Sequence, residues 1–440
     1  MRDIELDASA VRHGQCLLRP LSRARWLGAL AHHATPEFCC SCASFLDSAR
    51  MFALAAALAV APLVIAIYAY LAYPLILIVI AKLRPRRITT VIRAPWPSVT
   101  ITVPVYNAAS TISATLESVL QLDYPRELLQ LLVISDASTD GTDDIVRGFA
   151  SRGVELLRHP VRVGKTAGEN AAIAAARGTI IVNIDATVSI PATSLKPLIQ
   201  VFDDTTIGIA SGRDVSVGDA DNKATGAESR YVGYEMWIRD LETAVGSIVG
   251  ASGCFYAIRR SVHAKPLPPD LSWDFASALV ARQQGYRSVS VPDAVCIVPR
   301  TGRLGTELKR KVRTMARGIS TLFYHRELMN PTRYGGFALM LVSHKLLRWL
   351  PYLLAPLAIL ALGVLAAEGI VARALLATIL VGVVVGTTGL GRRSKTAPAP
   401  VALAGFVLAS LIAGFLAWCD ALRHAQLATW EPTPRPEAQT

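Results

Sequence analysis

The chain has 440 residues, of which 52 % are hydrophobic and 18 % are charged, and its mean hydropathy is +0.39. This composition excludes a wholly soluble protein, and the polar middle of the chain excludes a wholly membrane-embedded one. The formal net charge of +12 does not indicate nucleic-acid binding, because much of the basic excess flanks apolar segments and no helix-turn-helix or aromatic RNA-binding signature is present. The charge favours membrane lipid head groups and a diphosphate ligand as partners.

Residues 1–50 precede the first apolar run, and we expect them to form a weakly structured extension; the abrupt change of composition also makes Met51 a candidate start of the natural protein. A metal-binding tract is an alternative, although the spacing matches no zinc pattern. Four cysteines lie in this extension near His32 and His33: Cys16, Cys39, Cys40 and Cys42.

Residues 51–81 form an almost uninterrupted apolar run that is long enough for a transmembrane helix. A basic cluster follows it, which predicts that the next domain is cytoplasmic. The cluster consists of Lys82, Arg84, Arg86 and Arg87.

Residues 95–326 read as one globular α/β domain in which strands alternate with helices. Such alternation predicts a doubly wound, mostly parallel sheet flanked by helices. The expected strands are 98–104, 129–135, 154–158 and 179–185, and the expected helices are 109–121, 141–150 and 166–177.

Residues 337–349 resemble an interfacial helix, because His344, Lys345, Arg348 and Trp349 stand just before an apolar run. Within 350–418 we expect three transmembrane helices, with basic residues 392–395 between the second and third, and then a tail over 419–440. The positive-inside rule then predicts a multi-pass protein of the inner membrane.

Several motifs occur in an order that resembles glycosyltransferase family 2, over roughly residues 95–420. They are Val103-Pro104-Val105-Tyr106-Asn107, the segment 135–142 (SDASTDGT), Arg162-Val163-Gly164-Lys165, Asn183-Ile184-Asp185-Ala186-Thr187, the segment 250–260, Trp273-Asp274-Phe275, Arg310-Lys311-Val312-Arg313, and the segment 343–349. The resemblance is to membrane-bound bacterial polysaccharide synthases of the cellulose, poly-N-acetylglucosamine and hyaluronan type. It implies the GT-A fold and inverting transfer of a hexose from a nucleotide diphosphate sugar, with a UDP-sugar as the expected donor.

By this resemblance, Asp136 would hydrogen-bond the nucleotide base, and Pro104 and Tyr106 would shape the floor of its pocket. Lys165 would lie near the donor. Basic side chains of a predicted helix, Arg310 and Arg313, would suit the diphosphate. The alternatives are an ordinary helix cap for the segment after Asp136 and a solvated basic face for the two arginines.

Asp185 would be the first carboxylate of the family's DxD motif and would touch ribose or a divalent cation, Mg²⁺ or Mn²⁺. Thr187 replaces the second acid, and a neutral hydroxyl is a poor ligand for these ions. Either Asp185 holds the cation with water and phosphate oxygens, or cationic side chains neutralise part of the charge.

Asp274 is the candidate general base, lying between two aromatic residues that would desolvate its carboxyl; the alternative is a plain Asp at a helix start. Gly250, Ser252 and Gly253 would leave room for an acceptor, with a tight turn as the alternative. The family's QxxRW signature has lost its Gln and Trp here, which argues against long-chain processivity.

The sequence therefore predicts an enzyme of cell-surface polysaccharide (exopolysaccharide) synthesis that acts on a glycan or lipid-linked acceptor. A polyprenyl-phosphate sugar transferase is one alternative. A non-catalytic nucleotide-sugar-binding subunit, working with synthase partner subunits, is the other.

Overall fold

The computed structural model describes residues 36–85, 95–217, 223–299, 304–391 and 398–423, together with residue 429. The expectations for His32, His33 and the cysteine side chains near them, for the basic residues 86–87 and 392–395, and for most of the tail lie outside the described residues.

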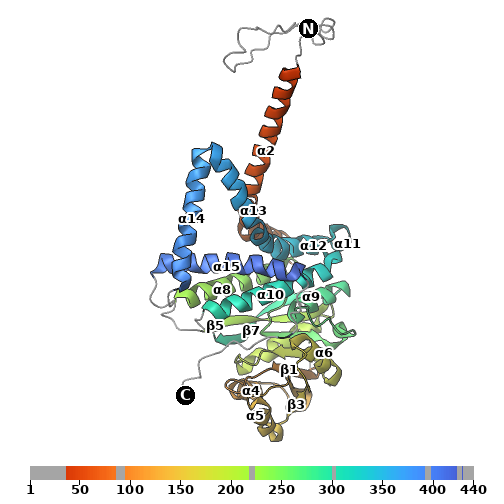
Figure 1. Ribbon diagram of the computed structural model, residues 1–440. Coiled ribbons are helices and arrows are strands. Elements are labelled where there is room, and N and C mark those ends of the chain that lie inside the picture. Colours follow the sequence, from red (N-terminus) through yellow and green to blue (C-terminus); the bar gives the residue numbers. More distant parts are fainter. Residues whose placement is uncertain are drawn as a thin grey trace.

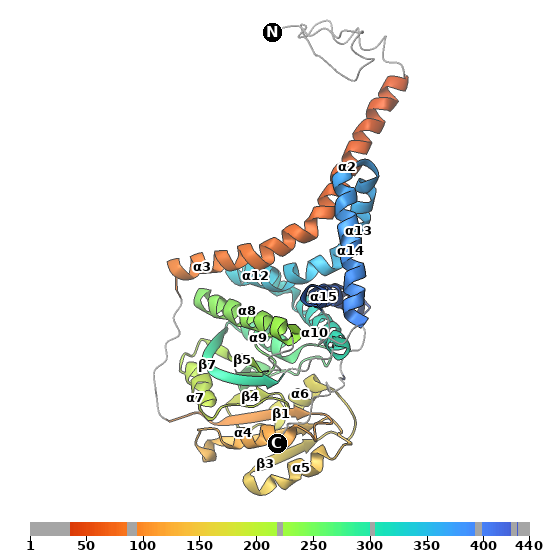
Figure 2. The same cartoon turned by 90° about the vertical axis from the view of Figure 1, so that its left-hand side faces the viewer.

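The first apolar segment is a long helix with one irregular turn. It comprises α2 (Pro36–Ile67), the π-helical turn η2 (Tyr68–Ala72) and α3 (Tyr73–Leu83), so helix begins before the expected residue 51. Pro74 has no N–H to donate to the carbonyl of Tyr70. The Tyr234 hydroxyl donates to this carbonyl instead, at 2.9 Å. After this turn α3 lies across the top of the α/β domain (Figure 2).

The domain is built on a seven-stranded sheet in the order β3-β2-β1-β4-β6-β5-β7. The pairs β1/β2, β1/β4, β2/β3 and β5/β7 are parallel, whereas β6 runs antiparallel to both of its neighbours. The predicted mostly parallel sheet is thereby confirmed. The strands are β1 (Val99–Val105), β2 (Leu129–Ser135), β3 (Val154–Arg158), β4 (Ile180–Ile184), β5 (Ile207–Val217), β6 (Phe255–Arg259) and β7 (Arg287–Pro299).

Helices pack on both faces of this sheet (Figure 1). They are α4 (Ile112–Leu120), α5 (Thr142–Gly148), α6 (Lys165–Ala175), α7 (Leu195–Gln200), α8 (Lys223–Val245), α9 (Trp273–Gln283) and α10 (Leu304–Tyr324). Short 3-10 turns join them at Arg126–Leu128, Ala150–Arg152, Ala192–Ser194, Val201–Asp203, Arg260–His263 and Arg326–Met329.

Strand β1 shows how the sheet prepares the site. Its alternate residues Val99, Ile101 and Val103 enter the main apolar core. Thr100 and Thr102 are buried too, on the opposite face. That face therefore needs buried polar partners, and α6 supplies one of them in Glu169.

The remaining helices are α11 (Pro331–Tyr334), α12 (Gly336–Leu341), the π-helical turn η9 (Val342–Leu346), α13 (Leu347–Glu368), α14 (Ile370–Gly391) and α15 (Ala399–Leu422). Among the described residues, four helical segments are long and apolar enough to cross a membrane: Ala49–Leu83, Gly336–Glu368, Ile370–Leu390 and Pro400–Leu422. The expected interfacial helix 337–349 corresponds to α12, η9 and the start of α13.

Helix α15 lies alongside α10 of the α/β domain and at a steep angle to α14 (Figures 1 and 2). The Lys311 ammonium lies 4.0 Å from the centre of the Phe406 ring, and the Phe323 and Trp418 rings are 6.0 Å apart. Both contacts join residues 95 positions apart, so the two helices run in the same direction for at least three turns.

Candidate functional site

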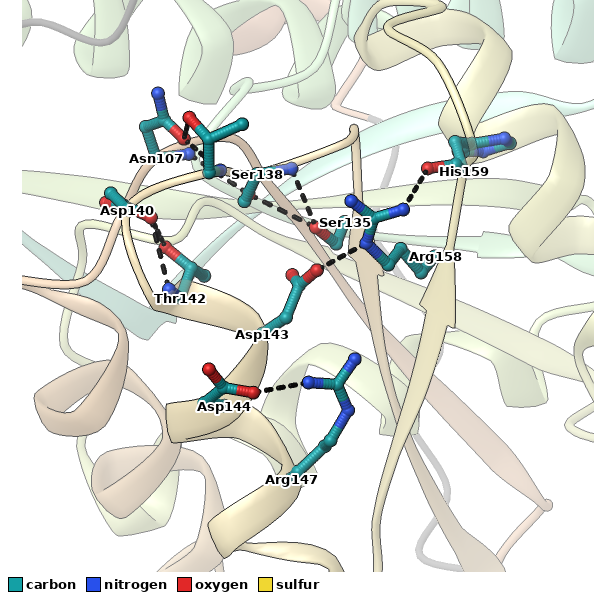
Figure 3. Close-up of polar contacts among 11 residues, drawn as sticks. Asn107, Ser135, Ser138, Asp140, Thr142, Asp143, Asp144, Arg147, Arg158 and His159 are labelled. Atoms are coloured by element: carbon teal, nitrogen blue, oxygen red, sulfur yellow. Dashed lines mark hydrogen bonds and ion pairs between the residues drawn. The ribbon is translucent and has the colours of Figure 1, made fainter.

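The loops that follow β1 and β2 are fastened together by short polar side chains (Figure 3). The backbone N–H of Asn107 donates to Ser138 Oγ at 3.1 Å, and Asn107 Oδ1 accepts the N–H of Thr139 at 2.9 Å. Asp140 accepts hydrogen bonds from the backbone N–H groups of Ala109 (3.0 Å) and Thr142 (3.1 Å). The hydroxyls and Asp140 of segment 135–142 thus shape the loop, but the N-cap residue of α5 is Gly141, which makes no side-chain capping hydrogen bond.

Asp136, in the same segment, holds a different loop. It is 3 % exposed, and its carboxylate accepts the N–H groups of Val163 at 2.6 Å and of Gly164 at 3.1 Å. Ala137 next to it has φ +58°, a backbone conformation that non-glycine residues rarely adopt except where the surroundings impose it. Gly164 has φ +88°, which explains glycine at this position.

Pro104 is paired with Ile134 in the sheet, and the N–H of Asp136 donates to the carbonyl of Val105 at 2.9 Å, so Tyr106 and Asp136 follow directly at the ends of the two neighbouring strands. The guanidinium of Arg162 stands 3.7 Å from the centre of the Tyr106 ring. Asp136 and a cation-covered aromatic ring therefore flank the end of β1, an arrangement that suits a planar base.

Lys165 is the central cation of the site. Its Nζ lies 2.6 Å from Asp185 Oδ1 and 3.5 Å from the carbonyl of Gly253. Burial opposes the charge of this ammonium, but Asp185, Glu169 and Asp274 together raise its pKa above the usual value. The ion pair brings two predicted residues, from α6 and from the end of β4, into direct contact.

Asp274 stands in the first turn of α9, where Ser272 Oγ donates to its Oδ1 at 2.7 Å. Trp273 and Phe275 on either side are buried, the first stacked on His263 at 4.3 Å. A Cβ placed on Gly253 would stand 3.2 Å from Asp274 Oδ2, so the glycine lets this loop approach the carboxylate.

Arg317 of α10 adds a further cation to the site. It donates to Thr166 Oγ1 at 2.6 Å and to the carbonyl of Leu271. Burial lowers its pKa to about 10, and Asp274 acts in the opposite direction. Arg313 precedes it by one helical turn and Arg310 by two.

Side chains of β5 and α8 hold the loop 250–253 in place. Ser252 is 1 % exposed, and its hydroxyl donates to both carboxylate oxygens of Asp214, at 2.7 and 2.6 Å. Arg239 donates to the carbonyl of Ala251 at 3.3 Å. Ser252 therefore positions the loop from its buried side, whereas Gly250 lies close to the side chains of Phe275 and Lys345, and Gly253 lies close to that of Asp274.

A divalent cation would have one predicted ligand here. Within the described ranges no three His, Cys, Asp or Glu side chains are grouped so that they could hold a metal ion. Mg²⁺ is nevertheless commonly bound through one or two carboxylates together with substrate phosphates and water. Asp185 fits that role, in competition with the Lys165 ammonium on its Oδ1.

The sequence did not reveal Glu169 or Asp214 as parts of the site, and it gave no separate role to Arg162, which stands in the motif of Lys165. Glu169 lies in an alanine-rich helix, and Asp214 lies on a strand without a motif. Only the spacing of Glu169, four residues after Lys165 on one helix face, offered a signal.

Comparison with known proteins agrees with this geometry. Residues 100–265 match the model of glycosyl transferase family 2. The chain is 28 % identical over 238 residues to an N-acetylglucosaminyltransferase of Rhizobium sp. (strain N33), covering 50 % of this chain and 52 % of the relative. It is 25 % identical over 181 residues to a beta-monoglucosyldiacylglycerol synthase of Nostoc sp. (strain PCC 7120), covering 40 % and 39 %. The chain thus spans about half the length, or less, of these curated relatives.

Among solved structures, the mannosyltransferase PcManGT from Pyrobaculum calidifontis, in complex with GDP-Man and Mn²⁺, is similar with a TM-score of 0.64 and 25 % identity. The similarity covers 85 % of this chain and 99 % of that one. The sheet order, the loops at its strand ends and these matches show that the α/β domain has the GT-A fold, and residues 100–265 within it match glycosyltransferase family 2.

Proposed function

We propose that the protein is a membrane-embedded, inverting hexosyltransferase that moves a sugar from a nucleotide diphosphate sugar to a glycan or lipid-linked acceptor. The observation that carries the proposal is the meeting of three groups at one loop. Asp274 Oδ2 faces Gly253, Lys165 Nζ lies 3.5 Å from the Gly253 carbonyl, and Asp185 lies 2.6 Å from Lys165.

In this proposal the donor lies across the ends of β1, β2 and β4. The base lies by Asp136 and Tyr106, and the diphosphate lies toward Lys165 and the cations of α10. Lys165 stabilises the negative charge that develops on the diphosphate as the bond to the sugar breaks. A divalent cation held by Asp185 and the phosphates would supply the same neutralisation; the Mn²⁺ of PcManGT supports this addition.

Asp274 is the proposed general base. It takes the proton of an acceptor hydroxyl while that oxygen attacks the anomeric carbon from the side opposite the diphosphate. One C–O bond forms, the other breaks, and the nucleoside diphosphate leaves with its electron pair. Attack from the opposite side inverts the anomeric centre.

The names of the relatives guide the choice of donor. Transfer of N-acetylglucosamine by the rhizobial proteins favours UDP-N-acetylglucosamine. The GDP-Man of PcManGT makes GDP-mannose the second candidate. The basic residues after the first apolar segment and the positive-inside rule support an inner-membrane protein with a cytoplasmic catalytic domain.

The test is release of nucleoside diphosphate from UDP-sugars and GDP-mannose by the detergent-purified full chain. Asp274→Asn is expected to lower turnover at least 100-fold, a loss typical of removing a general base, while nucleotide binding persists. Asp144→Asn removes an exposed carboxylate on α5 and serves as the matched control. Near-normal turnover by Asp274→Asn would refute the assignment. Binding without turnover in the unmodified chain, with acceptors supplied, would favour the non-catalytic subunit.

A further inference from the structure

Three elements around the proposed site meet at the hydroxyl of Thr166. This residue follows Lys165 in the first turn of α6 and is 0 % exposed. Its Oγ1 donates to the carbonyl of Leu271, in the loop before α9, at 2.8 Å. The same oxygen accepts a hydrogen bond from Arg317 Nη2 of α10 at 2.6 Å. One buried hydroxyl therefore joins the start of α6 to the loop that leads into α9.

Arg317 closes this junction with the same amino group. Its Nη2 also donates to the carbonyl of Leu271 and lies 3.4 Å from the carbonyl oxygen of Pro269. An amino group of a guanidinium has two hydrogens, so three protein oxygens leave this one without a hydrogen for a diphosphate oxygen. Because a rigid, planar guanidinium contacts both α6 and the loop before α9, it fixes the separation of these two elements.

A second side chain of α10 holds the next residue of the loop. Thr321, one turn after Arg317, donates to the Arg317 carbonyl at 2.7 Å and accepts the backbone N–H of Ser272 at 2.9 Å. Ser272 is the N-cap residue of α9, but its hydroxyl donates to Asp274 Oδ1 and makes no capping bond to the helix. The orientation of Asp274 therefore depends on a loop that α10 holds at two consecutive residues.

The proposed reaction needs a fixed distance between Lys165 and Asp274. In-line attack places the cation that faces the leaving diphosphate and the base on opposite sides of the anomeric carbon. Both groups approach Gly253, but they belong to different helices. The Thr166 junction begins one residue after Lys165 and ends three residues before Asp274. A misplacement of about 1 Å can lower a rate about 100-fold, so a junction at this place controls turnover.

We propose that Thr166 and Arg317 are positioning residues of the transfer reaction, which set the separation between the Lys165 ammonium and the Asp274 carboxylate. The inference rests on the proposed function and adds two residues to its geometry. Neither residue has to touch the donor or the acceptor. The alternative role for Arg317 is a contact with the diphosphate through its charge, and that role makes a different prediction for a lysine at this position.

The first variant is Thr166→Val, which keeps the shape of the side chain and removes the hydroxyl. Turnover is measured on the detergent-purified full chain as release of nucleoside diphosphate from UDP-N-acetylglucosamine and GDP-mannose. We expect kcat to fall about tenfold or more. The dissociation constant of UDP or GDP should stay within about twofold, because the contacts of Asp136 and Asp185 remain. Thr166→Ser, which keeps the hydroxyl, is expected to restore kcat.

Thr243→Val is the matched control. The hydroxyl of this buried threonine on α8 also joins two elements, since it donates to the carbonyl of Arg239 and accepts the N–H of Ser290 on β7. This variant is expected to lower Tm but to leave kcat within about twofold of normal, because a loss of stability alone does not move the catalytic groups.

Arg317→Lys separates positioning from charge and decides the question should Thr166→Val not fold. The lysine keeps the charge but not the planar fork, so we expect kcat to fall about tenfold. Normal kcat in this variant would overturn the role of Arg317 in positioning. In the Asp274→Asn background, Thr166→Val is expected to cause less than about a twofold further loss, because the base that it positions is absent. A full tenfold further loss there would overturn the proposal.

Two outcomes distinguish failure of this inference from failure of the proposed function. Normal kcat in folded Thr166→Val, beside an inactive Asp274→Asn, would overturn the positioning role alone. Absence of turnover in the unmodified chain, or normal turnover of Asp274→Asn, would overturn the proposed function and the positioning role together.

Discussion

Glu169 offers the most quantitative test of the buried polar layer beneath the site. It is 0 % exposed on α6, and its Oε2 accepts from Asn183 at 2.6 Å and from Thr102 at 3.1 Å. Burial raises its pKa from 4.5 to about 7, with Lys165 opposing and Asp185 reinforcing the shift. A carboxyl whose pKa is higher in the folded than in the unfolded state stabilises the fold at low pH. That contribution is fully present below about pH 4.5 and is lost as pH rises through about 7.

The size of the effect follows from the two pKa values. Each pKa unit corresponds to about 1.4 kcal/mol, so the ionised carboxylate costs about 3 kcal/mol at pH 8. Glu169→Gln keeps an acceptor oxygen for Asn183 and Thr102 but stays neutral at every pH. We expect the variant to match the unmodified chain near pH 5. At pH 8 the Tm of the variant should be higher than that of the unmodified chain by roughly 6–12 °C, because about 1 kcal/mol shifts the Tm of a domain of this size by about 2–4 °C.

The assay is thermal unfolding of the purified full chain between pH 5 and pH 8. Glu127→Gln, an exposed position on a short 3-10 turn, is the control and is expected to run parallel to the unmodified protein. Parallel curves for Glu169→Gln would refute the reasoning, because the buried carboxyl would then not change its ionisation on folding.

Three further predictions concern the loop 250–253, the divalent cation and the membrane topology. Gly253→Ala places a Cβ 3.2 Å from Asp274 Oδ2 and is expected to lower kcat about tenfold or more with donor KM unchanged; a kcat within twofold of normal would show that the loop adjusts freely. Thr187→Asp restores the second acid of the motif and is expected to lower the Mn²⁺ concentration needed for half-maximal turnover, measured after EDTA treatment. A protease site added at the C-terminus is expected to be cut from the cytoplasmic side in inverted vesicles, because α15 runs beside α10; protection there would mean that α15 crosses the bilayer.

Much of the α/β domain could be predicted from the sequence because its first strands are short segments rich in Val, Ile and Leu that alternate with helical segments. Strands β1, β2 and β4 are buried along nearly their whole length, as parallel strands covered by helices must be. The strand directions in the later part of the domain were harder to predict from the sequence. Strand β6 follows the loop 250–253 and runs antiparallel, and no periodicity in five residues distinguishes that direction from a parallel one.

In the site, too, some residues could be found from motifs, whereas the roles of others depend on their contacts in the folded protein. Asp136 and Asp185 follow strands and Asp274 begins a helix, so the parallel topology and the family resemblance marked all three as candidates. Asp185 and Asp274 act on the Lys165 ammonium, whereas Asp136 holds the backbone just before it. The roles of Asp140 and Ser252 were not predictable, because a carboxylate or hydroxyl in a loop serves equally well as a ligand or as a clamp. Only the bonds that each makes, to backbone N–H groups or to Asp214, separate the two.

Helix α15 shows what hydropathy alone cannot decide. Its composition suits a membrane span, and the segment Pro400–Leu422 qualifies as one by length. Gly389 and Gly405 let α14 and α15 cross with backbones in contact, and Gly414 receives the ring of Tyr352. Trp418 Nε1 then donates to the carbonyl of Trp349 at 2.8 Å, which fixes the far end of α15 at the base of α13. An apolar helix held at both ends against α10 can bury one face on the catalytic domain and the other in lipid without crossing the bilayer. A span and an in-plane helix of this kind have the same composition, so only the placement of the small residues and the register with α10 distinguish them.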